Sequence, residues 1–265
     1  MLEIKHVSKT FAPGTVNEKK ALVDVSLKIN DGDFVTVLGS NGAGKSTLFQ
    51  AISGTYRIDS GKIVLDGKNI AYVPEYKRAK YIGRLFQDPL KGTAPHMTIE
   101  ENLALAYLRA GTHTNPLSRI SRADRERFRD ALKKLDMGLE DRMDVPVGTL
   151  SGGQRQALTL LMATIVPPKL LLLDEHTAAL DPKTAAKVLD LTEQIVAENK
   201  LSTIMITHNM KDAIRMGNRL IMMHEGRIIY DVSGEEKKNL KVSQLLEKFE
   251  QVSGEEFAND RMMLN

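Results

Sequence analysis

The sequence has 265 residues, of which 42% are hydrophobic and 27% charged, and its formal net charge is +3. This composition predicts a folded chain with a sizeable core and excludes wholesale disorder. The small net charge gives no basis for nucleic-acid or anionic-membrane binding, and without cysteine there is no disulfide framework. No apolar run approaches the ~20 residues that cross a bilayer, and the first residues lack a signal-peptide core.

Alternating apolar and polar side chains in the first third of the chain predict three strands, at residues 2–7, 21–29 and 62–67. A long polar connection separates the first two. We expect these strands to form a small antiparallel sheet beside a parallel core.

An apolar run, a glycine-rich turn and a helix-forming segment follow one another between Val35 and Ser53. The turn reads G-x-x-x-x-G-K-S, the pattern of a phosphate-binding loop in its strand–turn–helix context. We expect Lys45 to reach the β- and γ-phosphates of a nucleotide and the Ser46 hydroxyl to hold Mg²⁺. The residues assigned to nucleotide binding are Ser40, Asn41, Gly42, Ala43, Gly44, Lys45, Ser46 and Thr47. The alternative is an ordinary glycine-rich connection.

A helical pattern occupies residues 98–135, in two pieces. Before it lies RLFQD, at residues 84–88, where a short apolar run ends at Gln87. The second helical piece carries five arginines between residues 119 and 129, interleaved with acidic residues. Mixed signs at helical spacing favour a solvated face over a nucleic-acid stripe.

Three chemistry-bearing segments follow in the second half of the chain. LSGGQ, from Leu150 to Gln154, precedes a helical stretch that two prolines end. The run 170–173 is four leucines followed by Asp174 and Glu175, which is typical of a strand buried in a parallel sheet. Residues 202–207 predict another buried strand, and His208 follows it.

The remaining elements close the domain. Asp181 and Pro182 have the N-cap and first-turn chemistry of a helix start. Residues 220–230 predict a hairpin, and Leu245, Leu246 and Phe249 a short appended helix. Strands that alternate with helices predict a parallel α/β sheet with its ligands at the carboxyl ends of the strands, where Gly39, Asp174 and His208 all lie.

The motifs in chain order resemble those of ATP-binding cassette (ABC) transporter ATPases. GSNGAGKS resembles the Walker A loop, Gln87 the Q-loop, LSGGQ the family signature, LLLLDE the Walker B strand, Ala179 to Asp181 the D-loop and His208 the switch histidine. The resemblance implies a phosphate-loop NTPase core with a mainly parallel sheet, an N-terminal antiparallel β subdomain and an inserted α-helical subdomain. It predicts an ATPase domain at residues 1–240, with the helical insertion at about 90–165, and a short helical tail at 241–265.

Transfer of a phosphoryl group to water needs neutralised charge, a positioned water and a base. We expect Ser46, Gln87 and Asp174 to hold Mg²⁺, Gln87 to contact the attacking water as a further catalytic residue, and Glu175 to act as the general base. The alternative for Glu175 is a second metal-site carboxylate without a role as base. The resemblance implies that His208 contacts the γ-phosphate and positions the water, and that Phe11 stacks on adenine.

The signature segment begins a helix, where free N–H groups suit an anion. In the family this segment caps the γ-phosphate bound to the other subunit, so two chains enclose two ATP molecules. The resemblance therefore assigns Ser151, Gly152, Gly153 and Gln154 to nucleotide bound by the partner. Asp181 is expected to couple the two sites.

One residue departs from the family pattern, because His176 follows Glu175 where most relatives have proline. DEHTAALD resembles a subgroup of bacterial importer ATPases encoded with a permease and a substrate-binding lipoprotein, some of them proposed to carry aromatic amino acids. A histidine tolerated in a turn is the favoured interpretation of His176.

These features predict a cytoplasmic ATPase subunit that forms a homodimer around ATP and Mg²⁺. It would lie on the inner face of the membrane through a separate permease and serve, with an extracytoplasmic binding protein, to import a small solute such as an amino acid. The first alternative is an ABC ATPase of an export, lipoprotein-release or cell-division complex. The second alternative is a soluble cassette acting on DNA or the ribosome. Such proteins usually have two cassettes or a long coiled coil, and this sequence predicts neither. Intact Glu175 and His208 argue against a non-hydrolysing module.

Overall fold

A computed structural model describes residues 1–110 and 120–253 of the chain. The chain divides into two compact units, one formed by residues 1–78 together with the chain from 201 onward, the other by residues 79–200. The predicted helical stretch at 98–135 and the predicted tail at 241–265 each include residues outside the described ranges. The boundaries predicted for the inserted subdomain and the tail remain predictions.

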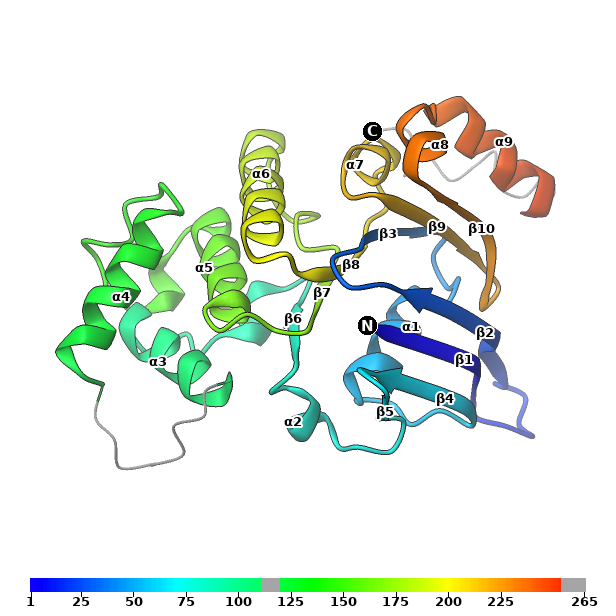
Figure 1. The fold of residues 1–265 in the computed structure, drawn as a ribbon, viewed down its shortest axis with the longest axis horizontal. Coiled ribbons are helices and arrows are strands. Elements are labelled where there is room, and N and C mark those ends of the chain that lie inside the picture. The colour runs from blue at the N-terminus through cyan, green and yellow to red at the C-terminus, as the bar shows by residue number, and fades with distance from the viewer. Residues whose placement is uncertain (111–119, 254–265) are drawn as a thin grey trace. The chain divides into compact units, whose positions relative to one another are not determined.

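The first unit contains the antiparallel sheet, in the order β2-β1-β4-β5 (Figure 1). Its strands are β1 (Leu2–Phe11), β2 (Lys19–Ile29), β4 (Ser60–Leu65) and β5 (Lys68–Asn69). The sequence predicted β1 only as far as residue 7, but the strand continues because Thr10 and Phe11 pair with Lys20 and Lys19. Irregularities in the register interrupt the alternation there, and the hydrophobic pattern cannot anticipate them.

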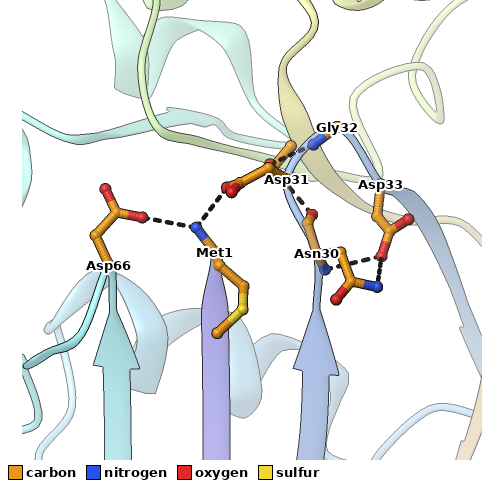
Figure 2. A network of polar contacts seen from close by, with 7 residues as sticks. Met1, Asn30, Asp31, Gly32, Asp33 and Asp66 are labelled. Atoms are coloured by element: carbon orange, nitrogen blue, oxygen red, sulfur yellow. Dashed lines mark hydrogen bonds and ion pairs between the residues drawn. The ribbon is translucent and has the colours of Figure 1, made fainter.

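A network of polar contacts ties the ends of these strands together (Figure 2). The amino group of Met1 lies 2.7 Å from Asp31 Oδ1 and 2.6 Å from Asp66 Oδ1. The backbone N–H of Gly32 donates to Ser202 Oγ at 3.0 Å. The network joins the turn after β2 to β1 and to the end of β4. It also reaches Ser202, the first residue of strand β8 (Ser202–Ile206) in the other sheet.

The same unit contributes four strands of the mainly parallel sheet, in the order β10-β9-β3-β8. They are β3 (Phe34–Gly39), β8 (Ser202–Ile206), β9 (Arg219–His224) and β10 (Arg227–Ser233). β3 runs parallel to both β8 and β9, and the β9–β10 pair is the predicted antiparallel hairpin. Every residue of β3 and β8 is buried, as expected for central strands covered on both faces.

Five helices accompany these sheets in the described part of the first unit, namely α1 (Lys45–Ser53), α2 (Glu75–Arg78), α7 (Met210–Arg215), α8 (Gly234–Lys238) and α9 (Val242–Ser253). The predicted C-terminal helix is α9, which Figure 1 shows beyond β10 and α8. Its Leu245 and Phe249 are 0% and 1% exposed and belong to a cluster with Leu38 and Met210. This apolar face packs α9 against the sheet and α7.

Buried cations close the C-terminal ends of two of these helices. The Arg78 guanidinium donates to the carbonyl oxygens of Ala51 and Ile52 at the end of α1, each at 2.8 Å. Lys237 Nζ donates to the carbonyl oxygens of Met216 and Gly217 just after α7. Positive side chains suit these positions because the last carbonyls of a helix have no partner within it.

The second unit carries the parallel pair β6 (Ile82–Leu85) and β7 (Leu170–Asp174). Its helices are α3 (Ile99–Ala110), α4 (Arg122–Lys133), α5 (Gly152–Thr164) and α6 (Pro182–Asn199), with short 3₁₀ turns η1 (Pro89–Gly92) and η2 (Val147–Thr149). The four leucines of β7 are fully buried, which confirms the predicted buried strand. The architecture is therefore mixed α/β, with an antiparallel N-terminal sheet and a mainly parallel sheet. Within the described ranges, no helix is both long and apolar enough to span a membrane.

Candidate functional site

The phosphate loop lies between β3 and α1 and depends on close backbone approaches at its two outer glycines. A Cβ on Gly39 would overlap the carbonyl oxygen of Met223, and one on Gly44 would overlap that of Ala21. Gly44 also has φ 98°, a left-handed conformation that favours glycine. The hairpin between β9 and β10 supports the loop, because Gly226 N donates to the Ala43 carbonyl at 3.0 Å.

Lys45 is folded back along this loop. Its side chain is 6% exposed, and Nζ donates to the carbonyl oxygens of Gly39 at 2.5 Å and Ser40 at 2.9 Å. Asn41, Gly42 and Ser46 are exposed, and Ser40 and Thr47 are partly exposed. Within the described residues, no side chain caps the N-terminus of α1. The loop therefore presents a buried ammonium group and an uncapped helix start, an arrangement that suits a polyphosphate.

Phe11 lies at the end of β1, beside a second aromatic ring that the sequence did not single out. Its ring centroid is 5.1 Å from that of Tyr56, with an interplanar angle of 73°. Lys9 Nζ lies 5.6 Å from the Phe11 centroid. In the same region Lys19 Nζ lies 3.3 Å from the position that a Cβ on Gly42 would occupy. Phe11 thus belongs to an aromatic and cationic surface that adjoins the phosphate loop.

His208 is exposed and lies level with the start of the phosphate loop. Val37 of β3 pairs with Ile206 of β8, so Gly39 and His208 each stand two residues beyond a paired position. Asn209 then caps α7, accepting from the backbone N–H of Lys211 and Asp212. Burial raises the pKa of Asp212, and the nearby charges of Arg215, His208 and Lys211 oppose this effect. The first unit brings Phe11, the loop and His208 to the same end of its strands.

Gln87, Asp174 and Glu175 gather at the carboxyl end of the β6–β7 pair in the second unit. Leu85 pairs with Leu173, so Gln87 and Glu175 each lie two residues further on. Glu175 has φ 44°, which is uncommon for a residue with a side chain and costs conformational energy. Backbone hydrogen bonds stabilise the turn, since Ala178 N donates to the Glu175 carbonyl at 3.0 Å.

His176 lies in a turn, as the sequence predicted, but it is buried there. Its side chain is 2% exposed, and Nε2 lies 3.1 Å from Thr192 Oγ1. Thr192 Oγ1 donates its single proton to the Val188 carbonyl at 2.8 Å. Nε2 must therefore carry the proton that joins His176 to Thr192. Burial lowers the pKa of His176 to about 4, so the ring is neutral at physiological pH. His176 anchors the turn after Glu175 to α6.

The signature residues begin α5 with a reciprocal capping box. Ser151 Oγ accepts from Gln154 N at 3.2 Å, and Gln154 Oε1 accepts from Ser151 N at 3.2 Å. Gln154 Nε2 also donates to the Met137 carbonyl at 3.2 Å. Ser151 and Gly152 remain exposed. The predicted helix start is present, with part of its donor capacity already satisfied locally.

Asp181 caps α6 beside the signature segment. Its Oδ1 accepts from Thr184 N at 3.1 Å. Hydrogen bonding from the Thr184 side chain, and then from this backbone N–H, lowers the pKa of the Asp181 carboxyl. Gly153 packs against Thr184, and a Cβ at Gly153 would overlap Thr184 Cγ2. A Cβ on Gly152 would lie 3.3 Å from Leu180 Cδ2. The start of α5 and the D-loop segment are therefore one packed structure within the second unit.

The donors expected for a metal are oxygen atoms of different kinds. Ser46 offers a hydroxyl, Gln87 an amide oxygen and Asp174 a carboxylate. Magnesium prefers such hard oxygen ligands and keeps several waters and phosphate oxygens of its own, so the chemistry of each of these donors fits Mg²⁺. Among the described residues, no group of three or more His, Cys, Asp or Glu side chains could hold a metal alone.

The chain was also compared with known proteins. The family model for ABC transporters matches residues 22–178. A tyrosine transport ATP-binding protein of Clostridioides difficile is 47% identical over 251 residues, which cover 94% of this chain and 99% of that protein. The spermidine/putrescine import ATP-binding protein PotA of Haemophilus influenzae is 33% identical, over 89% of this chain and 59% of PotA.

Solved structures agree in fold. A dimeric ATP-binding cassette in a post-hydrolysis state with ADP and Pi superposes with a TM-score of 0.76 at 27% identity, over 88% of this chain and 98% of that one. Clostridium perfringens cbiO1, part of the transporter complex cbiONQ, gives a TM-score of 0.76 at 26% identity, over 95% of this chain and 94% of cbiO1. The likeness extends over nearly the whole chain in both structures.

Proposed function

Because the chain belongs to the ABC transporter family, as an ATPase subunit that hydrolyses ATP to power transport, we propose that it drives a bacterial importer for a small solute, with an aromatic amino acid as the first candidate. The observation that carries the ATPase assignment is the phosphate loop, where buried Lys45 meets the uncapped start of α1. An amino-acid substrate is supported by the 47% identical relative, whose name specifies tyrosine transport.

Each unit supplies a different part of the proposed chemistry. In the first, Lys45 and the loop N–H groups bind the phosphates, Phe11 contacts the adenine and His208 contacts the γ-phosphate. In the second, Glu175 accepts a proton from the attacking water. The left-handed backbone of Glu175 and the buried contact of His176 with Thr192 support this role, because they define the turn that carries Glu175. Mg²⁺, held by Ser46, Gln87 and Asp174, would neutralise charge on the β- and γ-phosphates.

The chain forms dimers in this proposal, and the ATP-bound state encloses two nucleotides. Ser151 to Gln154 of one protomer contact the phosphate bound by its partner, and Asp181 couples the sites. The similarity to a dimeric cassette supports this arrangement. The partners are membrane permease subunits and an extracytoplasmic substrate-binding protein, so the chain lies at the inner face of the membrane. The cbiO1 structure, described as part of a transporter complex, supports the permease.

The Glu175→Gln variant tests the catalytic assignment. It should bind ATP normally but hydrolyse it about 10²- to 10⁴-fold more slowly, because general-base catalysis is lost. The stalled protein should accumulate as an ATP-bound dimer, detected as a doubled mass by light scattering. The matched control is Glu193→Gln, an exposed carboxylate on α6 in the same unit, which should keep wild-type turnover. Normal hydrolysis by Glu175→Gln would refute the assignment.

The substrate class needs a separate measurement. Deletion of the gene from its host should abolish uptake of labelled tyrosine at micromolar concentration, and the wild-type gene should restore it. Uptake of spermidine and xylose should be unchanged. Loss of spermidine uptake with retained tyrosine uptake would reject the amino-acid proposal and leave the ATPase assignment intact.

A further inference from the structure

Arg84 carries a positive charge next to the Walker B carboxylate. It lies on β6, paired with Leu172 of β7. Alternate residues of a strand share a face, so Phe86 follows Arg84 on the same face and Asp174 follows Leu172. The Arg84 Nη2 atom lies 3.8 Å from Asp174 Oδ2. The register of two neighbouring strands therefore places this guanidinium beside Asp174.

The position of Arg84 is fixed on two sides. Its guanidinium carbon lies 4.5 Å from the centroid of the Phe86 ring, a distance suited to stacking of a planar cation on an aromatic face. The Arg84 and Asp174 side chains are only 12% and 16% exposed. Water screens a pair at this depth less than it screens a surface pair, so the two charges influence each other strongly.

We propose that Arg84 is the resting counter-ion of Asp174, and that Mg²⁺ binds by competing with the guanidinium for this carboxylate. Arg84 is then a positioning residue that sets the affinity for the metal–nucleotide complex. It also links the strand that ends near Gln87 to the strand that ends at Asp174 and Glu175. The inference rests on the proposed role of Asp174 in holding Mg²⁺.

The competing explanation is that Arg84 only fills space between Phe86 and β7. The two explanations predict opposite signs. A competing cation, once removed, leaves Asp174 with more attraction for Mg²⁺. A structural support, once removed, lets the carboxylate move and weakens metal binding. The sign of the change therefore decides between them.

The experiment measures the affinity of the full chain for a fluorescent ATP analogue with Mg²⁺ and with EDTA, in a Glu175→Gln background so that nothing is hydrolysed. The ratio of the two dissociation constants is the metal enhancement. Arg84→Met should increase this enhancement at least fivefold, while Arg84→Lys, which keeps the charge, should stay within about twofold of the parent. An unchanged or smaller enhancement in Arg84→Met would overturn the proposal.

Two further variants separate this inference from the proposed function. Asp174→Asn should abolish most of the enhancement, and adding Arg84→Met to it should change nothing more, because Arg84 acts through Asp174. Full enhancement in Asp174→Asn would overturn the metal role of Asp174 together with this inference. A loss in Asp174→Asn but no gain in Arg84→Met would overturn the inference alone.

A control and a metal-free readout complete the test. Arg125→Met removes an arginine whose Nε lies 2.6 Å from Glu100 Oε2 in the same unit, and it should not change the enhancement. In EDTA, Arg84→Met should lower the melting temperature, because it leaves a little-exposed carboxylate without this cation. Asp174→Asn should recover part of that loss in the double variant. Additive losses in melting temperature would contradict the ion pair.

Discussion

Two helices begin at segments assigned to nucleotide binding, α1 to the nucleotide of its own chain and α5 to that of the partner, and their N-termini are built in opposite ways. α1 starts after Gly44 in a left-handed conformation, and within the described residues no side chain caps it. α5 starts at Ser151, where Ser151 and Gln154 bond each other's backbone N–H groups. The first terminus leaves its donors for a phosphate, whereas the second satisfies part of its own.

This difference predicts different roles in nucleotide binding for the start of α1 in the first unit and the start of α5 in the second. An uncapped terminus next to a buried ammonium group can bind a nucleotide by itself. A capped terminus gains less from an anion, because a phosphate must compete with bonds that already exist. We therefore expect the phosphate loop to determine ATP affinity in the single chain, and the signature segment to contribute only when a partner presents a bound phosphate.

The largest expected effect comes from breaking the uncapped site. Lys45→Ala should weaken ATP binding by more than about 100-fold, since the phosphates lose their main fixed charge. The measurement is titration calorimetry with ATP. Lys20→Ala, which removes an exposed lysine of β2, is the control and should bind within about twofold of wild type. Undiminished ATP affinity in Lys45→Ala would contradict the assignment of the loop.

The next prediction concerns the C-terminal end of α1. Unlike the uncapped N-terminus, this end has side-chain hydrogen bonds, because Arg78 donates to its last carbonyl oxygens. Arg78 is 3% exposed and also donates to the carbonyl oxygens of Ala71 and Val73. Arg78→Met leaves several buried carbonyl groups without donors and should cost about 3 kcal/mol of unfolding free energy. Urea denaturation measures this loss. The exposed Arg57 provides the control, because Arg57→Met should change stability by less than about 0.5 kcal/mol.

A smaller effect in the second unit depends on pH. The pKa of His176 is lowered to about 4 in the folded chain, against 6.5 for an ordinary histidine. As the pH falls, the unfolded chain therefore protonates this histidine before the folded chain does. The contribution of neutral His176 to the free energy of unfolding is present above pH 6.5 and is lost as the pH falls toward 4. Between pH 7.5 and pH 5 the loss should be about 2 kcal/mol. His176→Gln can still donate to Thr192 but does not titrate, so the difference in pH dependence between the two proteins isolates the group.

Much of this architecture is predictable because it follows from local patterns. The uncapped start of α1 is encoded by Gly44 and Lys45 within one motif, and the capped start of α5 by Ser151 and Gln154 three residues apart. The four leucines before Asp174 specify a buried strand. In each case the residues that fix the structure are neighbours in the sequence, so hydrophobic period and capping chemistry are enough.

What the sequence did not predict depends on contacts between distant residues. Arg84 reaches Asp174 only through the pairing of β6 with β7, and Phe11 meets Tyr56 only through the arrangement of the first unit. His176 lies in the turn that the sequence predicted, but its burial against Thr192, 16 residues away on α6, was not predicted. The arginine of RLFQD was a usable signal, since a charge inside a short apolar run has to find a partner.

The smallest expected change in stability tests the capped terminus. Ser151→Ala should cost about 1 kcal/mol, the usual worth of an N-cap, whereas Ser151→Asp keeps a capping oxygen and should be nearly neutral. The two variants should rank differently when ATP-bound dimers are trapped in the Glu175→Gln background. Ser151→Asp should form the fewest, because its carboxylate repels the partner's phosphate, and its single-chain ATP affinity should remain normal.

A matched cap elsewhere in the same unit makes this test specific. Ser121 caps α4 in a reciprocal box with Asp124, the same arrangement that Ser151 makes with Gln154. Ser121→Ala should therefore lose a similar amount of stability, about 1 kcal/mol, yet trap dimers as well as the parent does. If Ser121→Ala and Ser151→Asp trapped dimers equally well, Ser151 would be a helix cap and nothing more. If only Ser151→Asp reduced the amount of trapped dimer, the N-terminus of α5 would contact a bound phosphate in the dimer and not in the single chain.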